Sequence, residues 1–261
     1  MKEFSLKDKV VLITGSEGQL GMSFVHFLLK SGAKVIGLDI NSNSKINNKN
    51  YFYSKCDITD LSSLNKTVNE LRSNFYLPNV LINNAAIDTP PNSKELDTGL
   101  FEEFSDSLLK EVINVNIIGL LNCCKIFGKI MKDKKEGSIV NISSIYGMLS
   151  PDQSIYDYKR KKGEIFFKPI SYSATKGSIF NITRYLAVYW AKNNVRVNTL
   201  SFAGVFNNQD KDFLDNYCSR IPIGRMAKPE DYFGPLFFLC SNMSGYVTGS
   251  NLVADGGWTA I

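Results

Sequence analysis

Short runs of Val, Ile and Leu alternate with longer segments of mixed polarity along this chain of 261 residues. Such runs are typical of parallel strands that are buried on both faces, and the mixed segments have the period of amphipathic helices. The apolar runs predict strands at residues 9–14, 33–40, 50–58, 79–83, 137–143, 195–200 and 251–254. The segments between them predict helices at residues 19–31, 60–74, 101–132, 172–193 and 229–240.

The alternation of strands and helices predicts an α/β fold. Helical crossovers that are right-handed give a doubly wound parallel sheet of the Rossmann type, with helices on both faces. No internal repeat or linker divides the sequence, so we expect a single domain over residues 1–261. Sheets of this kind bind ligands at the carboxyl ends of their strands, and the candidate chemistry is expected there.

Composition and charge exclude several classes of protein. Apolar residues make up 44% of the chain and charged residues 21%, as in an ordinary globular protein. The net charge of +5 is spread along the chain apart from a basic cluster at residues 159–162, so nucleic-acid binding is not expected. The first residues lack the apolar core of a signal peptide, and no uninterrupted apolar run is long enough to span a bilayer. We therefore expect a cytoplasmic protein that does not bind membranes.

Cysteine and histidine usage argues against metal and disulfide chemistry. The five cysteines are odd in number and show no Cys-x-x-Cys spacing, which fits a reducing compartment without a zinc site. His26 is the only histidine, in an apolar helical context, and we expect it to have no chemical role.

A glycine-rich turn after the first predicted strand is a candidate phosphate-binding site. The segment TGSEGQLG opens a helix, where the backbone can approach a pyrophosphate closely and the helix N-terminus faces the anion. Its spacing differs from G-x-G-x-x-G, and such a turn can also be purely structural. The candidate cofactor-binding residues in it are Gly15, Ser16, Glu17, Gly18, Gln19, Leu20 and Gly21.

Asp39 lies at the end of the second predicted strand. A carboxylate at this position can accept hydrogen bonds from both ribose hydroxyls of adenosine, and it repels a 2'-phosphate. Glu17 adds a second negative charge, and no basic residue stands beside the two. Each carboxylate alone could be a plain turn or cap residue, but together they favour NAD over NADP.

Tyr172 and Lys176 stand four positions apart in the segment YSATK. On a helix they share a face, as they would in the polar stripe of any amphipathic helix. A tyrosine that acts as a base near neutral pH needs its pKa lowered by roughly 3 units, or about 4 kcal/mol. One ammonium about 4 Å away supplies roughly that much at an effective dielectric constant of about 20. We therefore expect Lys176 to lower the pKa of Tyr172.

Taken together, the motifs resemble those of the short-chain dehydrogenases/reductases. In chain order they are TGSEGQLG, NNAA, VNIIG, NISSIYG, YSATK, VRVN and DGGW, and they cover nearly the whole sequence. The resemblance implies an NAD-dependent enzyme that interconverts a secondary alcohol and a ketone, since the cofactor carries the hydride. It implies a catalytic tetrad of Asn116, Ser144, Tyr172 and Lys176.

The resemblance also assigns roles to individual residues. Ser144 would bind the substrate oxygen, and Asn116 would hold a water that links Lys176 to solvent, although a buried amide bonded to the backbone is an equally simple account of Asn116. Beyond the glycine turn, Tyr172 and Lys176, the implied cofactor contacts are Asp39, Ile40, Asp57, Ile58, Asn83, Asn84, Ala85, Ala86, Gly204, Val205 and Asn207.

The sequence departs from the family pattern in two further places. Phe202 and Ala203 replace the usual Pro-Gly after the VRVN strand, and the gap between Ser144 and Tyr172 is longer than in most members. The extra residues predict an inserted loop at residues 148–171 beside the active site. Its basic residues Lys159, Arg160, Lys161, Lys162 and Lys168 indicate either binding of an anionic, sugar-like substrate or a solvated charge run on an oligomer surface.

The pattern as a whole resembles members linked to bacterial surface-sugar and flagellin modification, which implies a sugar phosphate or nucleotide-linked sugar as substrate. A polyol or sugar-acid dehydrogenase and a 3-oxoacyl-type ketoreductase are alternative enzymes. A dinucleotide-binding regulatory protein without turnover is the alternative outside catalysis. Family members generally form dimers or tetramers, so we expect a homotetramer or homodimer.

Overall fold

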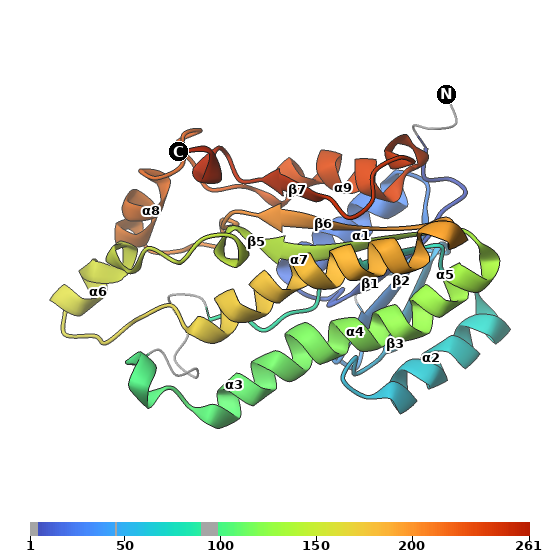
Figure 1. Ribbon diagram of the computed structural model, residues 1–261, viewed down its shortest axis with the longest axis horizontal. Coiled ribbons are helices and arrows are strands. Elements are labelled where there is room, and N and C mark those ends of the chain that lie inside the picture. Colours follow the sequence, from blue (N-terminus) through green and yellow to red (C-terminus); the bar gives the residue numbers. More distant parts are fainter. Residues whose placement is uncertain (1–4, 45, 90–98) are drawn as a thin grey trace.

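A seven-stranded parallel sheet forms the centre of the computed structural model, which describes residues 5–44, 46–89 and 99–261 (Figure 1). The strand order is β3-β2-β1-β4-β5-β6-β7. The order reverses direction between β1 and β4, as in a doubly wound fold, so the predicted α/β class is confirmed. The strands are β1 (Val10–Thr14), β2 (Lys34–Asp39), β3 (Tyr51–Lys55), β4 (Val80–Asn83), β5 (Gly137–Ser144), β6 (Val195–Phe202) and β7 (Asn251–Ala254).

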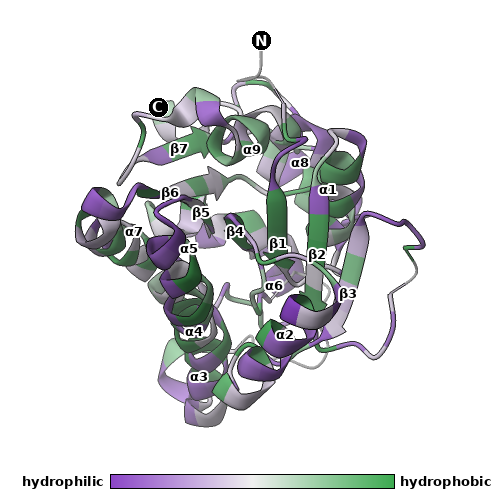
Figure 2. Cartoon of the chain, turned by 90° about the vertical axis from the view of Figure 1, so that its right-hand side faces the viewer, coloured by the Kyte–Doolittle hydropathy of each residue, from purple (hydrophilic) through white to green (hydrophobic). Residues whose placement is uncertain are grey.

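Helices cover both faces of this sheet. One core layer packs α1 and α9 against residues such as Val11 and Ile13 of β1, and the other packs α2, α4, α5 and α7 against Leu12. The strands are therefore buried on both sides, and Figure 2 shows hydrophobic residues concentrated along β1 and polar ones along the outer helices. The helices are α1 (Gln19–Lys30), α2 (Leu61–Asn74), α3 (Asp106–Ile113), α4 (Leu120–Cys123), α5 (Lys129–Lys134), α6 (Asp157–Lys161), α7 (Ile170–Trp190), α8 (Lys211–Cys218) and α9 (Phe233–Cys240).

The segments α3, α4 and α5 are parts of one helical rod, Asp106–Lys134, which has wider turns at Asn114–Gly119 and Cys124–Gly128. This rod alone among the described helices has the length and apolar character that a bilayer crossing requires. Half of its most apolar stretch is buried, because the rod packs as a core helix on the sheet and on α7. Gly128, for example, lies so close to Trp190 that a Cβ there would meet the indole at 2.4 Å.

The inserted segment is more ordered than a loop. It contains a short helical turn at Gln153–Tyr156 and the helix α6, and α7 begins at Ile170. A further helix, α8, lies in the stretch after β6 for which the sequence predicted no element, and Asp210 caps it by accepting from Phe213 N at 2.9 Å. The predicted inserted loop contains these helical turns because Tyr156 and Phe166 are core residues. Their rings pack on each other, and Tyr156 also packs on Phe213 of α8.

Several polar contacts tie the insertion to the α8 region. The Tyr158 hydroxyl donates to Asp210 at 2.7 Å and Lys162 donates to Asp212 at 2.7 Å. Arg220 donates to Asp152 at 2.7 Å, and Asn216 donates to the Ile155 carbonyl at 3.1 Å. The insertion and α8 therefore form one packed unit over the carboxyl ends of β5 and β6.

Candidate active site

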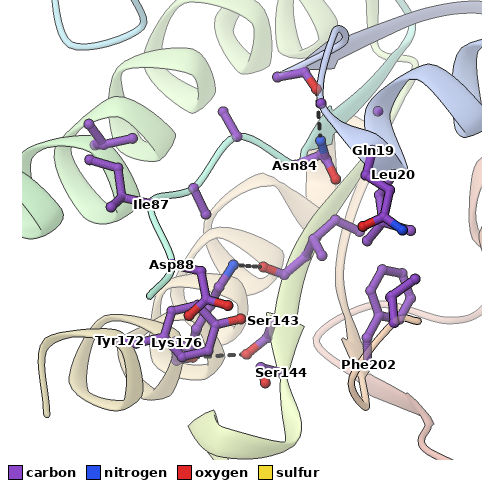
Figure 3. A pocket seen from close by; sticks show the side chains of 18 of the residues that line it. Gln19, Leu20, Asn84, Ile87, Asp88, Ser143, Ser144, Tyr172, Lys176 and Phe202 are labelled. Carbon is purple, nitrogen blue, oxygen red and sulfur yellow. Dashed lines mark hydrogen bonds between the residues drawn. The ribbon is translucent and has the colours of Figure 1, made fainter. Parts of the chain in front are cut away.

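A cavity of about 900 Å³ opens along the carboxyl ends of the strands, where the topology places a ligand site. The glycine turn after β1 and Asp39 of β2 line one end. Ser144 of β5, with Tyr172 and Lys176 of α7, lines the other (Figure 3). The fold thus brings residues from distant parts of the sequence into one continuous hollow.

The glycine turn is shaped by close backbone contacts. Gly15 has φ +66°, and a Cβ there would lie 2.9 Å from Ala85 Cα. A Cβ at Gly21 would lie 1.9 Å from the Gly15 carbonyl oxygen. Asn84 fixes the turn by donating to the carbonyls of Thr14 and Gly15 at 3.0 and 3.2 Å. Only glycine fits at positions 15 and 21, which leaves bare backbone facing the cavity at the start of α1, as a pyrophosphate requires.

The nucleotide end of the cavity carries negative charge. Asp39 accepts hydrogen bonds from Glu17 N at 3.0 Å and from Asn41 N at 3.1 Å. Asp57 accepts from Thr59 N at 2.8 Å. Among the described residues, the only basic side chains lining the cavity are Lys168 and Lys176, which lie at the opposite end. These carboxylate acceptors fit an adenosine ribose with free hydroxyls.

Most of the other predicted cofactor contacts line the cavity. They are Glu17, Gly18, Gln19, Leu20, Ile40, Ile58, Ala85, Ala86, Gly204, Val205 and Asn207. Gln19 also donates to the Phe206 carbonyl at 2.7 Å, so the glycine turn touches the segment after β6. Gly204 N of that segment donates to the Tyr217 hydroxyl of α8 at 2.7 Å. This bond holds the loop, in which Phe202 and Ala203 replace the usual Pro-Gly pair. Sequence reasoning missed Asn41 and Gln209 as lining residues.

Two predicted contacts lie outside the cavity lining. Asn83 is buried and donates to Asn141 Oδ1 at 2.8 Å, because the two residues are in register on β4 and β5. Ser16 is fully buried beneath the turn, next to Gly37. Neither side chain lines the cavity, and the cofactor contacts expected at these two positions stay predictions.

Ser144, Tyr172 and Lys176 converge at the far end. Lys176 Nζ donates to the Ile142 carbonyl at 3.0 Å and lies 5.7 Å from the centroid of the Tyr172 ring. Burial lowers the pKa of Lys176 to about 8, and the charge of Asp88 acts in the opposite direction. The Ser144 hydroxyl accepts from Tyr146 N at 3.1 Å, which fixes the end of β5.

The electrostatics of Tyr172 differ from the prediction. Burial raises the pKa of the Tyr172 phenol well above its ordinary value, and the negative charge of Asp88 raises it further, while the Ser144 hydroxyl acts in the opposite direction. The expected net lowering of the Tyr172 pKa is therefore wrong for the protein alone, because the loss of hydration is the largest effect on the phenol.

Asn116 lies in the wider helical turn and is not part of the cavity lining. Its carboxamide oxygen accepts from Ile87 N at 2.8 Å, and its Nδ2 donates to the Ile87 carbonyl at 3.1 Å and to Thr175 Oγ1 at 3.1 Å. The side chain thus holds the loop after β4 against α7. This is the backbone-bonded amide that the sequence left open, and the role of Asn116 in holding a water stays a prediction.

The basic residues of the insertion separate into two groups. Lys159 pairs with Glu164 at 3.0 Å, Arg160 pairs with Asp157, and Lys162 pairs with Asp212 at 2.7 Å, all outside the cavity lining. Lys168 lines the cavity. Its ion-pair partner is Asp88, which the sequence analysis overlooked. Asp88 lies two positions after the NNAA segment, beyond the end of β4. That position was the available signal, since residues past strand ends form such sites.

Comparison with known proteins relates the whole chain to one group of enzymes. A family model described as enoyl-(acyl carrier protein) reductase matches residues 16–259. The chain is 30% identical over 273 residues to 2-dehydro-3-deoxy-D-gluconate 5-dehydrogenase of Dickeya dadantii, with 100% of this chain and 99% of that protein covered. It is 28% identical over 262 residues to post-translational flagellin modification protein A of Campylobacter coli, with coverages of 97% and 99%.

A solved structure gives the same relationship in three dimensions. The short-chain dehydrogenase of Leptospira borgpetersenii serovar Hardjo-bovis with bound NAD+ is 35% identical and superposes with a TM-score of 0.87. The match covers 98% of this chain and 95% of that one. The similarity therefore extends over both ends of the cavity.

Proposed function

From the premise that this chain belongs to the short-chain dehydrogenase/reductase family, we propose that it interconverts a secondary alcohol and a ketone on a carbohydrate-type substrate, with NAD as its cofactor. The observation that carries the proposal is the single cavity, which joins a bare-backbone glycine turn to Ser144, Tyr172 and Lys176. Its two ends supply the two binding functions of a dehydrogenase within one Rossmann-type unit.

The cofactor assignment rests on the nucleotide end. Asp39 and Glu17 present two carboxylates and no cation, a charge pattern that accepts ribose hydroxyls and opposes a 2'-phosphate. Gly15 and Gly21 leave room for the pyrophosphate. When bound, the nicotinamide supplies hydride acceptance and donation.

The catalytic assignment rests on the other end. Tyr172 exchanges the proton of the substrate hydroxyl, and Ser144 hydrogen-bonds the substrate oxygen as charge develops on it. The raised pKa of Tyr172 keeps the phenol protonated at neutral pH, as a proton donor to a ketone must be. Lys176, anchored on the Ile142 carbonyl, places its ammonium beside the phenol in both directions of the reaction. Asn116 positions the adjoining loop.

Assembly and location are part of the same proposal. Tyr185, Val188 and Tyr189 are exposed on α7, and the two tyrosine rings stack at 5.9 Å. An apolar face of this kind on a monomer surface fits a subunit contact, and we propose a homodimer or homotetramer in the cytoplasm.

Replacement of Tyr172 by Phe tests the proposal. The variant removes one hydroxyl, so turnover of sugars and polyols, followed by absorbance of the reduced nicotinamide, should fall at least about 1000-fold. NADH binding, followed by its fluorescence, should stay within about twofold of the wild type. Turnover that survives in Tyr172→Phe would refute the assignment.

A further inference from the structure

An ion pair lies inside the catalytic end of the cavity, beside the proposed acid/base residue. Lys168 of the insertion donates to Asp88 Oδ1 and, at 2.8 Å, to the Thr89 carbonyl. Its Nζ lies 4.8 Å from the centroid of the Tyr172 ring, nearer than that of Lys176. Figure 3 shows Asp88 directed toward Tyr172 and Lys176.

Lys168 is held in place from several directions. Its side chain is 5% exposed, and its backbone is clamped by Gln153, which accepts from Lys168 N at 2.9 Å and donates to Lys168 O at 3.1 Å. The ammonium cannot swing toward a ligand without leaving Asp88. An anionic substrate would therefore have to displace a carboxylate that is already in contact, which removes most of its electrostatic gain.

Asp88, unlike Lys168, is partly exposed and can accept a hydrogen bond from a ligand. Its side chain is 44% exposed, and Oδ1 accepts from Lys168 and, at 2.7 Å, from Thr89 N. Within the described residues, Oδ2 accepts no hydrogen bond. The charge of Asp88 raises the pKa of both Tyr172 and Lys176, which places the carboxylate close to the reacting groups.

The walls around Asp88 are aromatic and polar. Tyr146, Tyr156 and Tyr217 line this end together with Phe213. These rings offer flat faces and hydroxyls to a ligand but no positive charge. A negatively charged acceptor beside phenols matches a ligand with several hydroxyl donors. A carboxylate or phosphate at Oδ2 would meet a like charge, while Lys168 is held by Asp88 and Lys176 by the Ile142 carbonyl.

We propose that Asp88, oriented by Lys168, is the residue that selects the substrate, and that the substrate is an uncharged polyol or sugar whose hydroxyl next to the reacting carbon donates to Asp88 Oδ2. This inference rests on the proposed function, and it replaces the expectation of an anionic substrate. In this proposal Lys168 of the insertion orients the Asp88 carboxylate and does not bind an anionic substrate.

Matched pairs of ligands test the selection. Glucitol and gluconate, and glycerol and glycerate, differ mainly in a terminal hydroxyl against a carboxylate. Wild-type kcat/KM with NAD should favour the uncharged member by at least about tenfold. Asp88→Asn should raise KM for the polyols roughly 10- to 100-fold, the loss expected for one hydrogen bond to a charged group, and should improve the relative use of the acids because Lys168 is released.

The control is Glu164→Gln, which breaks the pair with Lys159 on the same insertion, outside the cavity lining, and should leave both ligand classes unchanged. Binding is also measured without turnover, as the rise in Tm that each ligand causes in the presence of NAD. A wild type that prefers the acids, equal losses for both classes in Asp88→Asn, or no Tm rise with any polyol would overturn the inference. If the polyols raise the Tm of the wild type but none is oxidised, the proposed function fails and the selectivity stands.

Discussion

The two ends of the cavity recognise their ligands by different means. The nucleotide end uses backbone and short side chains at the ends of β1, β2 and β4, and its carboxylates Glu17 and Asp39 are free of basic partners in the cavity lining. The catalytic end uses side chains from the loop after β4, the insertion and α7, and two of its charges, Asp88 and Lys168, form an ion pair. The nucleotide end excludes ligands by its shape and its negative charge. The catalytic end selects ligands by the Asp88 oxygen that the ion pair leaves available.

This difference has a consequence for mutation. At Gly15 and Gly21 of the nucleotide end a single added methyl group is not tolerated, because the obstacle is backbone. At the catalytic end the proposed selection depends on the charge of one side chain, Asp88. The predictions below separate these two kinds of sensitivity, from the largest effect to the smallest.

Gly21→Ala should have the largest effect. Its Cβ would lie 1.9 Å from the Gly15 carbonyl oxygen, so the turn must move, at a cost of roughly 3 kcal/mol, or about 10 °C in Tm. NADH binding, measured by fluorescence, should be lost. Gly18→Ala is the matched control in Tm, since a Cβ there meets the same oxygen at 3.4 Å. Equal Tm losses in the two variants would contradict the account of a backbone-limited turn.

Lys176 should make stability depend on pH. Burial lowers its pKa to about 8, below the value of about 10.4 in an unfolded chain, so between these pH values the unfolded state binds more protons. The free energy of unfolding should therefore rise with pH across this window, by up to roughly 3 kcal/mol. Lys176→Met should abolish this rise in urea titrations at pH 8 and 10. A variant with the same pH dependence as the wild type would show that the ammonium is well hydrated.

Asn116→Ala should have a smaller effect on stability and a specific one on turnover. It leaves the Ile87 backbone groups without their partner, which costs about 2 kcal/mol, and it releases the loop that carries Asp88. We expect kcat/KM to fall roughly tenfold while the Kd for NADH changes little. Asn122 lies on the same helical rod and donates to the carbonyls of Ile58 and Thr59, so Asn122→Ala is the control. It should cost similar stability and leave kcat unchanged at saturating cofactor. Equal losses of kcat would assign Asn116 a purely structural role.

Elements with strong local signals could be predicted from the sequence. The strands, the glycine turn and the convergence of Ser144, Tyr172 and Lys176 follow from periodicity and from parallel topology. The side-chain direction of Asn83 could not, because it depends on its register with Asn141 across the sheet. The pKa of Tyr172 could not either, since the prediction counted the Lys176 cation and omitted the dehydration of the phenol.

The pairing of charges in the insertion could not be predicted from the sequence either. Its lysines look alike in the sequence, but Lys159 and Lys162 find acidic partners on the surface while Lys168 finds Asp88, eighty positions earlier, inside the cavity. Such pairings are set by tertiary packing. The helix α8 was missed for the same reason, since its buried side is formed by rings that pack on Tyr156 and Trp258.

The packing of the insertion on α8 bears on how substrate range can evolve in this protein. Arg220, Asp210 and Asp212 hold the segment that carries Lys168, and Tyr217 of α8 holds the loop at Gly204. A recombinant that receives residues 148–171 alone would inherit a lysine without its scaffold. A new substrate specificity therefore requires exchange of the insertion and the α8 region together. We expect these two segments to change together as substrate range evolves.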